Sequence, residues 1–357
     1  MTAQSARRSW RRVALVCLTM AFAFASGACA TERLLGAAND QDRAALFDEI
    51  WREFDLHYSF FTLKHVDWAA IGATYRPRAI AATSDQEFAF QVGKMLNELH
   101  DVHVSLTPTG VGYAMRYLSP SDTSAALFDP ELSLARYVRS THTTPRRQFR
   151  FGMISDSIGY VLLPSFVGSA LATELDAALD AMPSATRLII DVRNNRGGGV
   201  TNAREIAGRF ADRARTYGYL RMRNGPRHDD FTDYIEERVE PTSSRTFRGE
   251  VVVLTNRRDF SSAEDFVMAM HVLPNVTIMG DTTAGASGGP LERELSNGWT
   301  YELSEWIEYT SDFRVFEEIG LAPDVVVKPA AGDAAAGFDR VLERAMGLAP
   351  RASLSAP

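Results

Sequence analysis

The chain has 357 residues, of which 45% are hydrophobic and 23% are charged. This length and composition predict about two folded domains and exclude a disordered chain, a collagen and a coiled coil. The 38 lysine and arginine residues against 45 aspartate and glutamate residues give a net charge of −7, so we expect no nucleic acid partner. The two cysteines, Cys17 and Cys29, both precede the folded body, which excludes a disulfide framework or a cysteine metal site there.

The first 28 residues have the pattern of a secretory signal peptide. Four arginines precede the apolar run from Val13 to Phe24, and small residues lead into Cys29. The apolar run is too short to span a bilayer. The segment before Cys29 resembles a bacterial lipoprotein cleavage box, although Ser26 stands where leucine is usual, and ordinary cleavage after Ala28 or Ala30 is the alternative. We therefore expect an exported, periplasmic protein with possible membrane attachment through lipidated Cys29.

Residues 29–106 are predicted to form an N-terminal helical cap domain, because apolar residues recur at three- and four-residue spacings from Asp40 to Leu106. Residues 107–150 contain Thr-Pro-Thr-Gly and Ser-Pro-Ser-Asp and are predicted to be a linker or loop region. The segment 331–357 is expected to hold a closing helix, Ala334 to Met346, and a tail.

Residues 151–330 alternate between strand and helix patterns, which predicts an α/β layer architecture. The predicted helices run from Ala170 to Met182, from about Thr201, and from Ser261. The predicted strands are Gly159 to Leu163, Arg187 to Arg193, Val251 to Thr255 and Val276 to Met279, with strand-like sequence over 291–328.

A glycine-rich turn follows one of the predicted strands. The strand Leu188 to Arg193 continues into Asn-Asn-Arg-Gly-Gly-Gly, which ends at Gly199 and opens a helix. Consecutive glycines let backbone N–H groups converge on a developing oxyanion. A phosphate cradle or a simple turn is the alternative, but no Gly-Lys-Ser/Thr follows to make a phosphate loop.

A pair of serines follows another buried strand. Ser261 and Ser262 open the next predicted helix, and a helix N-terminus stabilises negative charge. The alternative is structural, because Ser261 and Glu264 also match a capping box.

Together these segments resemble the tail-specific, or C-terminal-processing, family of serine proteases. The matching stretches are Asp-Val-Arg-Asn-Asn-Arg-Gly-Gly ending at Gly198, Phe-Ser-Ser-Ala-Glu ending at Glu264, and Gly-Asp-Thr-Thr-Ala-Gly ending at Gly285. The resemblance implies a crotonase-like α/β protease core with an N-terminal helical domain, and leaves no segment for a PDZ insert. It assigns the nucleophile to Ser261 and the oxyanion site to Gly197, Gly198 and the N–H of Ser262.

The expected general base separates two branches of this family. Many members place a lysine after the Thr-x-Gly element, but this chain has Ala286 there, and its lysines are Lys64, Lys94 and Lys328. A serine–lysine dyad is therefore not expected. The chain is similar instead to the tricorn protease core, whose base lies in a Leu-x-Asp-x-His motif; the corresponding residue is His103.

The same resemblance assigns an orienting carboxylate to Glu317, in a Glu-x-x-Gly-x-x-Pro-Asp stretch that ends at Asp324. A tricorn-like tetrad has a serine before the histidine, whereas this chain has Val102. Glu317 is therefore expected to contact His103 either directly or through water.

Each of these residues has an alternative interpretation. His103 could be a structural histidine, or could bind zinc with His100 and Asp101, although no third clear ligand is present. Ser262 and Glu318 are the rivals of Ser261 and Glu317. Asp101 is expected to orient the turn beside His103, and Asp191 and Arg193 are expected to hold the end of their strand.

The functional prediction is an exported serine endopeptidase that acts on peptide or protein substrates and needs no metal or cofactor. The alternative is a non-catalytic relative that binds hydrophobic ligands or peptides in the same cleft, lined by residues such as Phe260 and Phe266.

Overall fold

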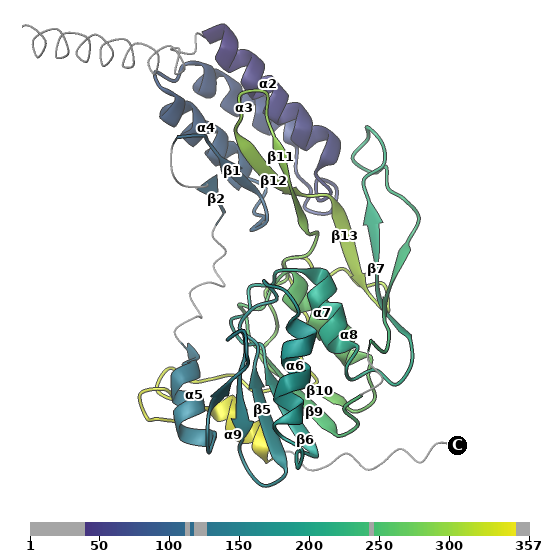
Figure 1. Ribbon diagram of the computed structural model, residues 1–357. Helices are drawn as coiled ribbons and strands as arrows, with labels where there is room; N and C mark the ends of the chain where they lie inside the picture. Colours follow the sequence, from purple (N-terminus) through teal and green to yellow (C-terminus); the bar gives the residue numbers. More distant parts are fainter. Residues whose placement is uncertain (1–39, 111–114, 118–126, 243–245, 348–357) are drawn as a thin grey trace, which may run out of the picture.

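The computed structural model describes residues 40–110, 115–117, 127–242 and 246–347, so the predicted signal peptide and Cys29 lie outside the described residues. Figure 1 shows an N-terminal unit of helices at the top and a larger α/β unit below it. Within the described part of the chain, no helix is long and apolar enough to cross a membrane.

The N-terminal unit contains three helices, as the spacing of apolar residues predicts. They are α2 (Asp40–His57), α3 (Trp68–Ile80) and α4 (Asp85–Asn97). Two of them begin at side-chain caps: Asp67 accepts from the N–H of Ala70, and Ser84 accepts from that of Glu87. Their buried faces meet in a core rich in aromatic residues, where the rings of Trp51 and Trp68 stack 6.3 Å apart.

A four-stranded antiparallel sheet completes this unit, and two of its strands come from late in the chain. The sheet has the order β11-β12-β1-β2. Its strands are β1 (Ser105–Thr107), β2 (Met115–Arg116), β11 (Pro290–Glu294) and β12 (Thr300–Ser304). Tyr301 and Leu303 of β12 are buried in the same core as the helices. The segment 151–330 therefore contributes strands to both units, and the described part of the predicted cap domain, residues 40–106, includes the start of β1.

The larger unit is built on a seven-stranded sheet of order β14-β10-β9-β6-β5-β4-β3. The five strands β5, β6, β9, β10 and β14 run parallel, and β4 and β3 add an antiparallel edge. Strands β6 and β10 are buried at every residue, which is typical of parallel strands covered on both faces. The strands are β3 (His142–Thr143), β4 (Arg150–Met153), β5 (Ile158–Leu162), β6 (Arg187–Asp191), β9 (Glu250–Thr255), β10 (Val276–Gly280) and β14 (Val325–Val326).

Helices cover both faces of this sheet (Figure 1). One apolar core takes α6 (Leu171–Asp180), α7 (Val200–Ala207) and α8 (Ser262–His271). A second core takes α5 (Pro130–Tyr137) and α9 (Arg340–Met346). The predicted α/β core beside an N-terminal helical domain is confirmed. The expected linker, however, contains α5 and β3, and the closing helix begins only at Arg340.

A third sheet, which the sequence did not predict, has the order β13-β7-β8. Its antiparallel strands are β7 (Arg215–Met222), β8 (Ile235–Val239) and β13 (Trp306–Thr310). Strand β13 follows β12 after a single residue, so this sheet continues from the N-terminal unit towards α7 and α8 (Figure 1).

A buried ion-pair network fixes the end of β6 just before the glycine-rich turn. The Arg193 guanidinium donates to Asp191 at 2.5 and 2.9 Å and to Asp339, at the start of α9, at 2.8 and 2.9 Å. These contacts confirm that Asp191 and Arg193 hold the strand end.

Candidate active site

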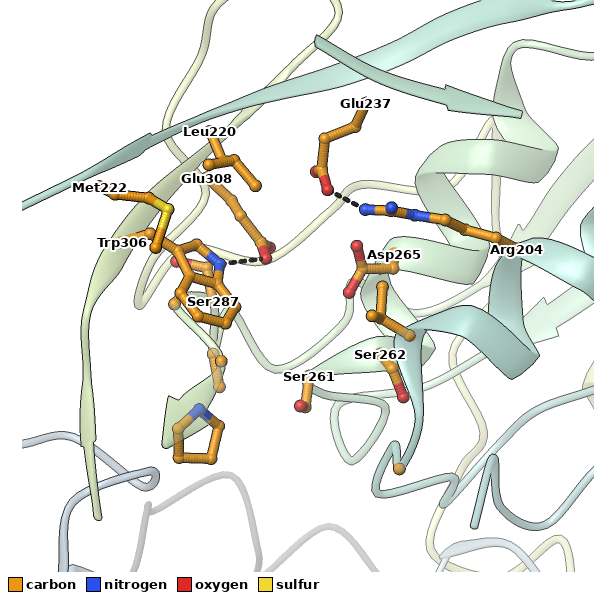
Figure 2. A pocket seen from close by; sticks show the side chains of 16 residues that line it. Arg204, Leu220, Met222, Glu237, Ser261, Ser262, Asp265, Ser287, Trp306 and Glu308 are labelled. Carbon is orange, nitrogen blue, oxygen red and sulfur yellow. Dashed lines mark hydrogen bonds and ion pairs between the residues drawn. The ribbon is translucent and has the colours of Figure 1, made fainter. Parts of the chain in front are cut away.

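Ser261 occupies a strained turn between β9 and α8. Its backbone has φ 59° and ψ −137°, a combination that non-glycine residues rarely adopt and that costs about 1–3 kcal/mol. The Ser261 N–H donates to the Ala286 carbonyl at 3.1 Å. Ser261 lines a cavity of about 410 Å³, where its side chain is drawn beside that of Ser262 (Figure 2).

The contacts of Ser261 and Glu264 do not form a capping box. The Ser261 side chain makes no capping hydrogen bond to α8. The Glu264 carboxylate instead accepts from the N–H groups of Gly285 and Ala286, each at 2.8 Å, and from the hydroxyl of Thr283. Glu264 therefore ties the Thr-x-Gly element to the start of α8.

The glycine-rich turn packs directly against the two serines. A Cβ atom on Gly197 would lie 2.9 Å from the Ser261 Cβ, and one on Gly198 would lie 2.4 Å from the Phe166 carbonyl carbon. Both residues also have positive φ angles, 83° and 141°. Only glycine fits these two positions without a shift of the backbone.

The amide groups of this turn differ from the expected oxyanion set in one member. The Gly197 N–H donates to the Asn195 Oδ1 at 2.8 Å, so it is already paired. Within the described residues, the N–H groups of Gly198 and Ser262 have no hydrogen-bond acceptor. Gly197, which is expected in the oxyanion set, thus lies close to Ser261 with its amide paired to Asn195 in this structure.

His103 is 4% exposed and is held in one tautomer. Its Nδ1 lies 3.0 Å from the Ser287 carbonyl oxygen, and because a carbonyl only accepts, Nδ1 carries the proton. Its Nε2 is buried without a hydrogen-bond partner in the described part of the chain. Burial lowers the pKa of His103, although Asp101 and the Ser287 carbonyl raise it. The arrangement is a neutral imidazole with an available Nε2 lone pair.

Asp101 orients the turn before His103, as expected. One carboxylate oxygen accepts from the His103 N–H at 2.8 Å, and the other accepts from the Ser304 hydroxyl at 2.9 Å. Both oxygens are thus used within the turn and the neighbouring strand β12. In the part of the chain that the structure describes, His100, Asp101 and His103 do not form a group that could hold a metal ion, and the His100 ring stacks on that of Tyr117 with centroids 5.3 Å apart.

Two consecutive carbonyl groups hold Ser261 and His103. Ala286 accepts from the Ser261 N–H, and Ser287 accepts from the His103 Nδ1–H. The His103 ring also lies 5.9 Å from the ring of Phe260, the residue before Ser261. Among the described residues no hydrogen bond joins Ser261 Oγ to His103 Nε2, and such catalytic contacts commonly tighten only when substrate binds.

Glu317 reaches His103 through Ser287 and not directly. One Glu317 oxygen accepts from the N–H of Ser287 at 2.8 Å and from its hydroxyl at 3.0 Å. The other lies 3.0 Å from the Lys64 ammonium. Among the described residues the expected direct contact between Glu317 and the imidazole is not made, and Ser287, which the sequence did not reveal, lies between them.

Lys64 neutralises this buried carboxylate. Its ammonium contacts Glu317 and Glu318, at 3.0 and 3.1 Å, and the carbonyl groups of Leu99 and His100. Burial lowers the pKa of Lys64, but Glu317 and Asp101 raise it further, so the net shift is upward. Lys64 therefore remains a cation and is not a general base. Glu318 is the more exposed of the two glutamates.

The cavity beside Ser261 has an acidic wall that the sequence analysis missed. Glu237, Asp265 and Glu308 are buried, and their carboxylate oxygens lie within 4.8 Å of one another. They come from β8, α8 and β13, and Figure 2 shows them pointing towards a common space. The apolar lining of the cavity comes from Leu220, Met222 and Trp306.

The apolar cleft expected around Phe260 and Phe266 does not have that composition. Phe266 is fully buried in the core and packs on Phe166 with ring centroids 5.3 Å apart. Neither phenylalanine lines the cavity that contains Ser261. The cavity combines acidic side chains with the apolar side chains of Leu220, Met222 and Trp306, so its lining differs from the one expected.

Comparisons with known proteins agree with this geometry. The model of Peptidase family S41 matches residues 157–327, and the model of the Tricorn protease C1 domain matches residues 39–97. The crystal structure of a candidate peptidase from Parabacteroides merdae is 31% identical, has a TM-score of 0.74, and is aligned over 87% of this chain and 96% of its own. The chain belongs to peptidase family S41.

More distant relatives in this serine-type peptidase family match over less of their length. The carboxy-terminal processing protease CtpA of Bacillus subtilis is 28% identical over 177 residues, which are 48% of this chain and 35% of CtpA. This chain thus spans about a third of that relative. The tricorn protease structure, at 16% identity and a TM-score of 0.54, shares the fold over 86% of this chain and 36% of its own. The predicted tail-specific protease family is confirmed.

Proposed function

We propose that the chain is a serine endopeptidase that hydrolyses peptide bonds in peptide or protein substrates, with Ser261 as its nucleophile. The observation that carries this proposal is the strained turn that holds Ser261 beside the amides of Gly198 and Ser262, which have no acceptor among the residues that the structure describes. Backbone strain of this kind is kept where function requires it. Membership of family S41 supports the same reaction.

In the proposed reaction each of these groups has one role. The Ser261 Oγ attacks the scissile carbonyl carbon while its proton passes to the His103 Nε2. The carbonyl oxygen becomes an oxyanion that accepts from the Gly198 and Ser262 N–H groups. The C–N bond then breaks, the leaving amine takes the proton from His103, and an acyl-enzyme ester remains. Water, deprotonated by the same Nε2, hydrolyses the ester and releases the acid and Ser261.

Ser287 and Glu317 act as positioning residues in this proposal. The Ser287 carbonyl holds the His103 Nδ1–H and stabilises the imidazolium that forms on proton transfer. Glu317 fixes Ser287 through its N–H and its hydroxyl, and Lys64 keeps that carboxylate paired. In this proposal these contacts orient the imidazole and stabilise its protonated form, as a carboxylate in direct contact with histidine does in other triads.

A fluorophosphonate probe tests the proposed nucleophile, because it phosphonylates only an activated serine. We expect the purified protein to form one covalent adduct, which peptide mass spectrometry places on Ser261. A chelator should leave the labelling rate unchanged, since no step uses a metal. A folded protein that gave no adduct, or an adduct on Ser262, would contradict the assignment.

We also propose that the protein is exported and attached to a membrane through a lipid on Cys29. The support is the order of arginines, apolar run and small residues before Cys29. Expression in a bacterial host with labelled palmitate should incorporate label into the wild type and not into Cys29→Ser. Equal labelling of both, or none in either, would leave ordinary signal cleavage as the better account.

A further inference from the structure

Three buried carboxylates converge in the cavity that contains Ser261. Glu237, Asp265 and Glu308 are 3%, 5% and 6% exposed, and their oxygens lie within 4.8 Å of one another. One oxygen of Glu237, Oε2, is buried with no hydrogen-bond partner in the described part of the chain. A buried carboxylate oxygen without a donor is costly, which indicates that a cationic or donor group completes the site.

The neighbouring side chains compensate this negative charge only in part. Arg204 forms an ion pair with Glu237 and donates to the Tyr217 hydroxyl at 2.7 Å. The Trp306 Nε1–H donates to Glu308 at 2.8 Å, and the Tyr217 hydroxyl lies 3.5 Å from Asp265. These contacts supply one guanidinium for three carboxylates.

The protonation of the three acids follows from this imbalance. Burial and mutual repulsion raise the pKa of Glu237 to about 8, and burial raises that of Asp265 to about 6. The pKa of Glu308 is raised well above its ordinary value, by burial and then by Asp265, Glu237 and Glu264. The empty cluster therefore keeps protons near neutral pH, and a cation that enters can replace them.

The cavity has the shape and chemistry of a site for a long basic side chain. Leu220, Met222 and Trp306 can pack against an aliphatic stem, and the carboxylates lie beyond them (Figure 2). An ammonium group has three tetrahedral donors, whose acceptors at about 2.8 Å lie about 4.6 Å apart. The carboxylate oxygens lie within 4.8 Å of one another, close enough for one ammonium group to contact all three.

Resting on the proposed peptidase function, we propose that this acidic pocket, formed by Glu237, Asp265 and Glu308 beside Ser261, binds the side chain of a lysine or arginine that flanks the scissile bond. The substrates are then peptides cut next to a basic residue. The same oxygens could take a calcium ion, but Arg204 already pairs with one oxygen of Glu237, and calcium needs six to eight oxygen ligands. The apolar side chains that line the cavity would also supply no oxygen ligand to a calcium ion.

Peptide hydrolysis with matched substrates tests the specificity. Two peptides would differ at one position only, lysine in one and norleucine, which has the same stem without the ammonium, in the other. We expect kcat/KM to be about 10- to 100-fold higher for the lysine peptide. This ratio corresponds to the free energy that charge-assisted hydrogen bonds contribute. Mass spectrometry of the products should place the lysine beside the cleaved bond. Glu308→Gln should reduce the preference at least about tenfold, whereas the exposed neighbour variant Glu236→Gln should keep it.

A binding measurement separates this inference from the proposed reaction. Ser261→Ala protein should bind the fluorescent cation 4-aminobenzamidine, more tightly at pH 8.5 than at pH 6 because the carboxylates lose their protons over this range. Adding Glu308→Gln to the Ser261→Ala protein should weaken binding at least about tenfold. If circular dichroism shows that the Glu308→Gln variant is unfolded, Asp265→Asn takes its place in the measurement. If the protein binds 4-aminobenzamidine but the wild type hydrolyses no peptide, the pocket for a basic side chain is supported and the proposed peptidase activity is overturned.

The opposite results are equally decisive. Hydrolysis of the norleucine and lysine peptides at the same rate, with no binding of 4-aminobenzamidine, would overturn the basic pocket and leave the peptidase intact. Calorimetry could also show that the wild type binds Ca²⁺ and that Glu308→Gln does not. If the peptide assay then shows no preference for lysine, the pocket is a metal site and the inference is overturned.

Discussion

Ser261→Ala should lower kcat for peptide hydrolysis by at least about 10⁴-fold, because the variant lacks the hydroxyl that forms the proposed acyl-enzyme. Alanine keeps the Cβ atom and the φ of 59° at this turn, so the fold and its strain should be unchanged. Initial rates with a fluorogenic peptide, measured at enzyme concentrations high enough to see the residual reaction, give the comparison. Thermal unfolding of the variant should match that of the wild type.

Ser262→Ala provides the matched comparison for this variant. Ser262 is buried, and its hydroxyl has no hydrogen-bond partner in the described part of the chain. The substitution removes that hydroxyl and preserves the amide that we propose as an oxyanion donor. It should therefore keep its reaction with a fluorophosphonate, which Ser261→Ala should lose. The reverse pattern would transfer the nucleophile to Ser262.

The strand, turn and helix units of the larger domain could be predicted because their signals are local. Strand β9 is a continuous apolar run, and α8 starts directly after the serine pair. The same holds for β6 and the glycine-rich turn that ends at Gly199. A resemblance of motifs then supplied the roles of Ser261 and His103, which spacing alone does not supply.

The arrangement of the sheets depended on contacts between distant segments and could not be predicted in the same way. Strand β1 pairs with β12, almost two hundred residues later, so no local pattern marks the contact. Strands β7 and β8 contain charged residues such as Arg215, Arg221 and Glu237, and few of the residues in these strands are fully buried. Their sequence therefore lacks the apolar run or clean alternation that indicates a strand.

The residues missed in the site share a physical reason. Ser287 contacts His103 through a backbone carbonyl, which every residue type offers, so its identity carried no signal. Lys64 was considered only as a base, whereas its contacts with Glu317 arise from the packing of the N-terminal unit on the core. The three acids of the pocket stand on separate elements and become a cluster only in the folded chain.

His103→Ala should reduce kcat by about 10³- to 10⁴-fold, because the serine proton then has no general base to accept it. His142→Ala is the matched control, since His142 is an exposed histidine on the edge strand β3 and should leave the rate as in the wild type. The residual rate of His103→Ala should rise steadily with pH, because hydroxide must replace the imidazole. A loss smaller than about tenfold would contradict the assignment of His103 as the base.

The pH profile of the wild type gives an independent readout of the same residue. The base works as neutral imidazole, and burial lowers the pKa of His103 below its ordinary value of about 6.5. As pH falls, kcat/KM should therefore hold to below about pH 6.5 and decline only as His103 becomes protonated. The measurement uses the norleucine peptide, which has no ammonium group for the carboxylates of the acidic pocket to bind. An unchanged acid limb in His103→Ala would show that another group accepts the proton.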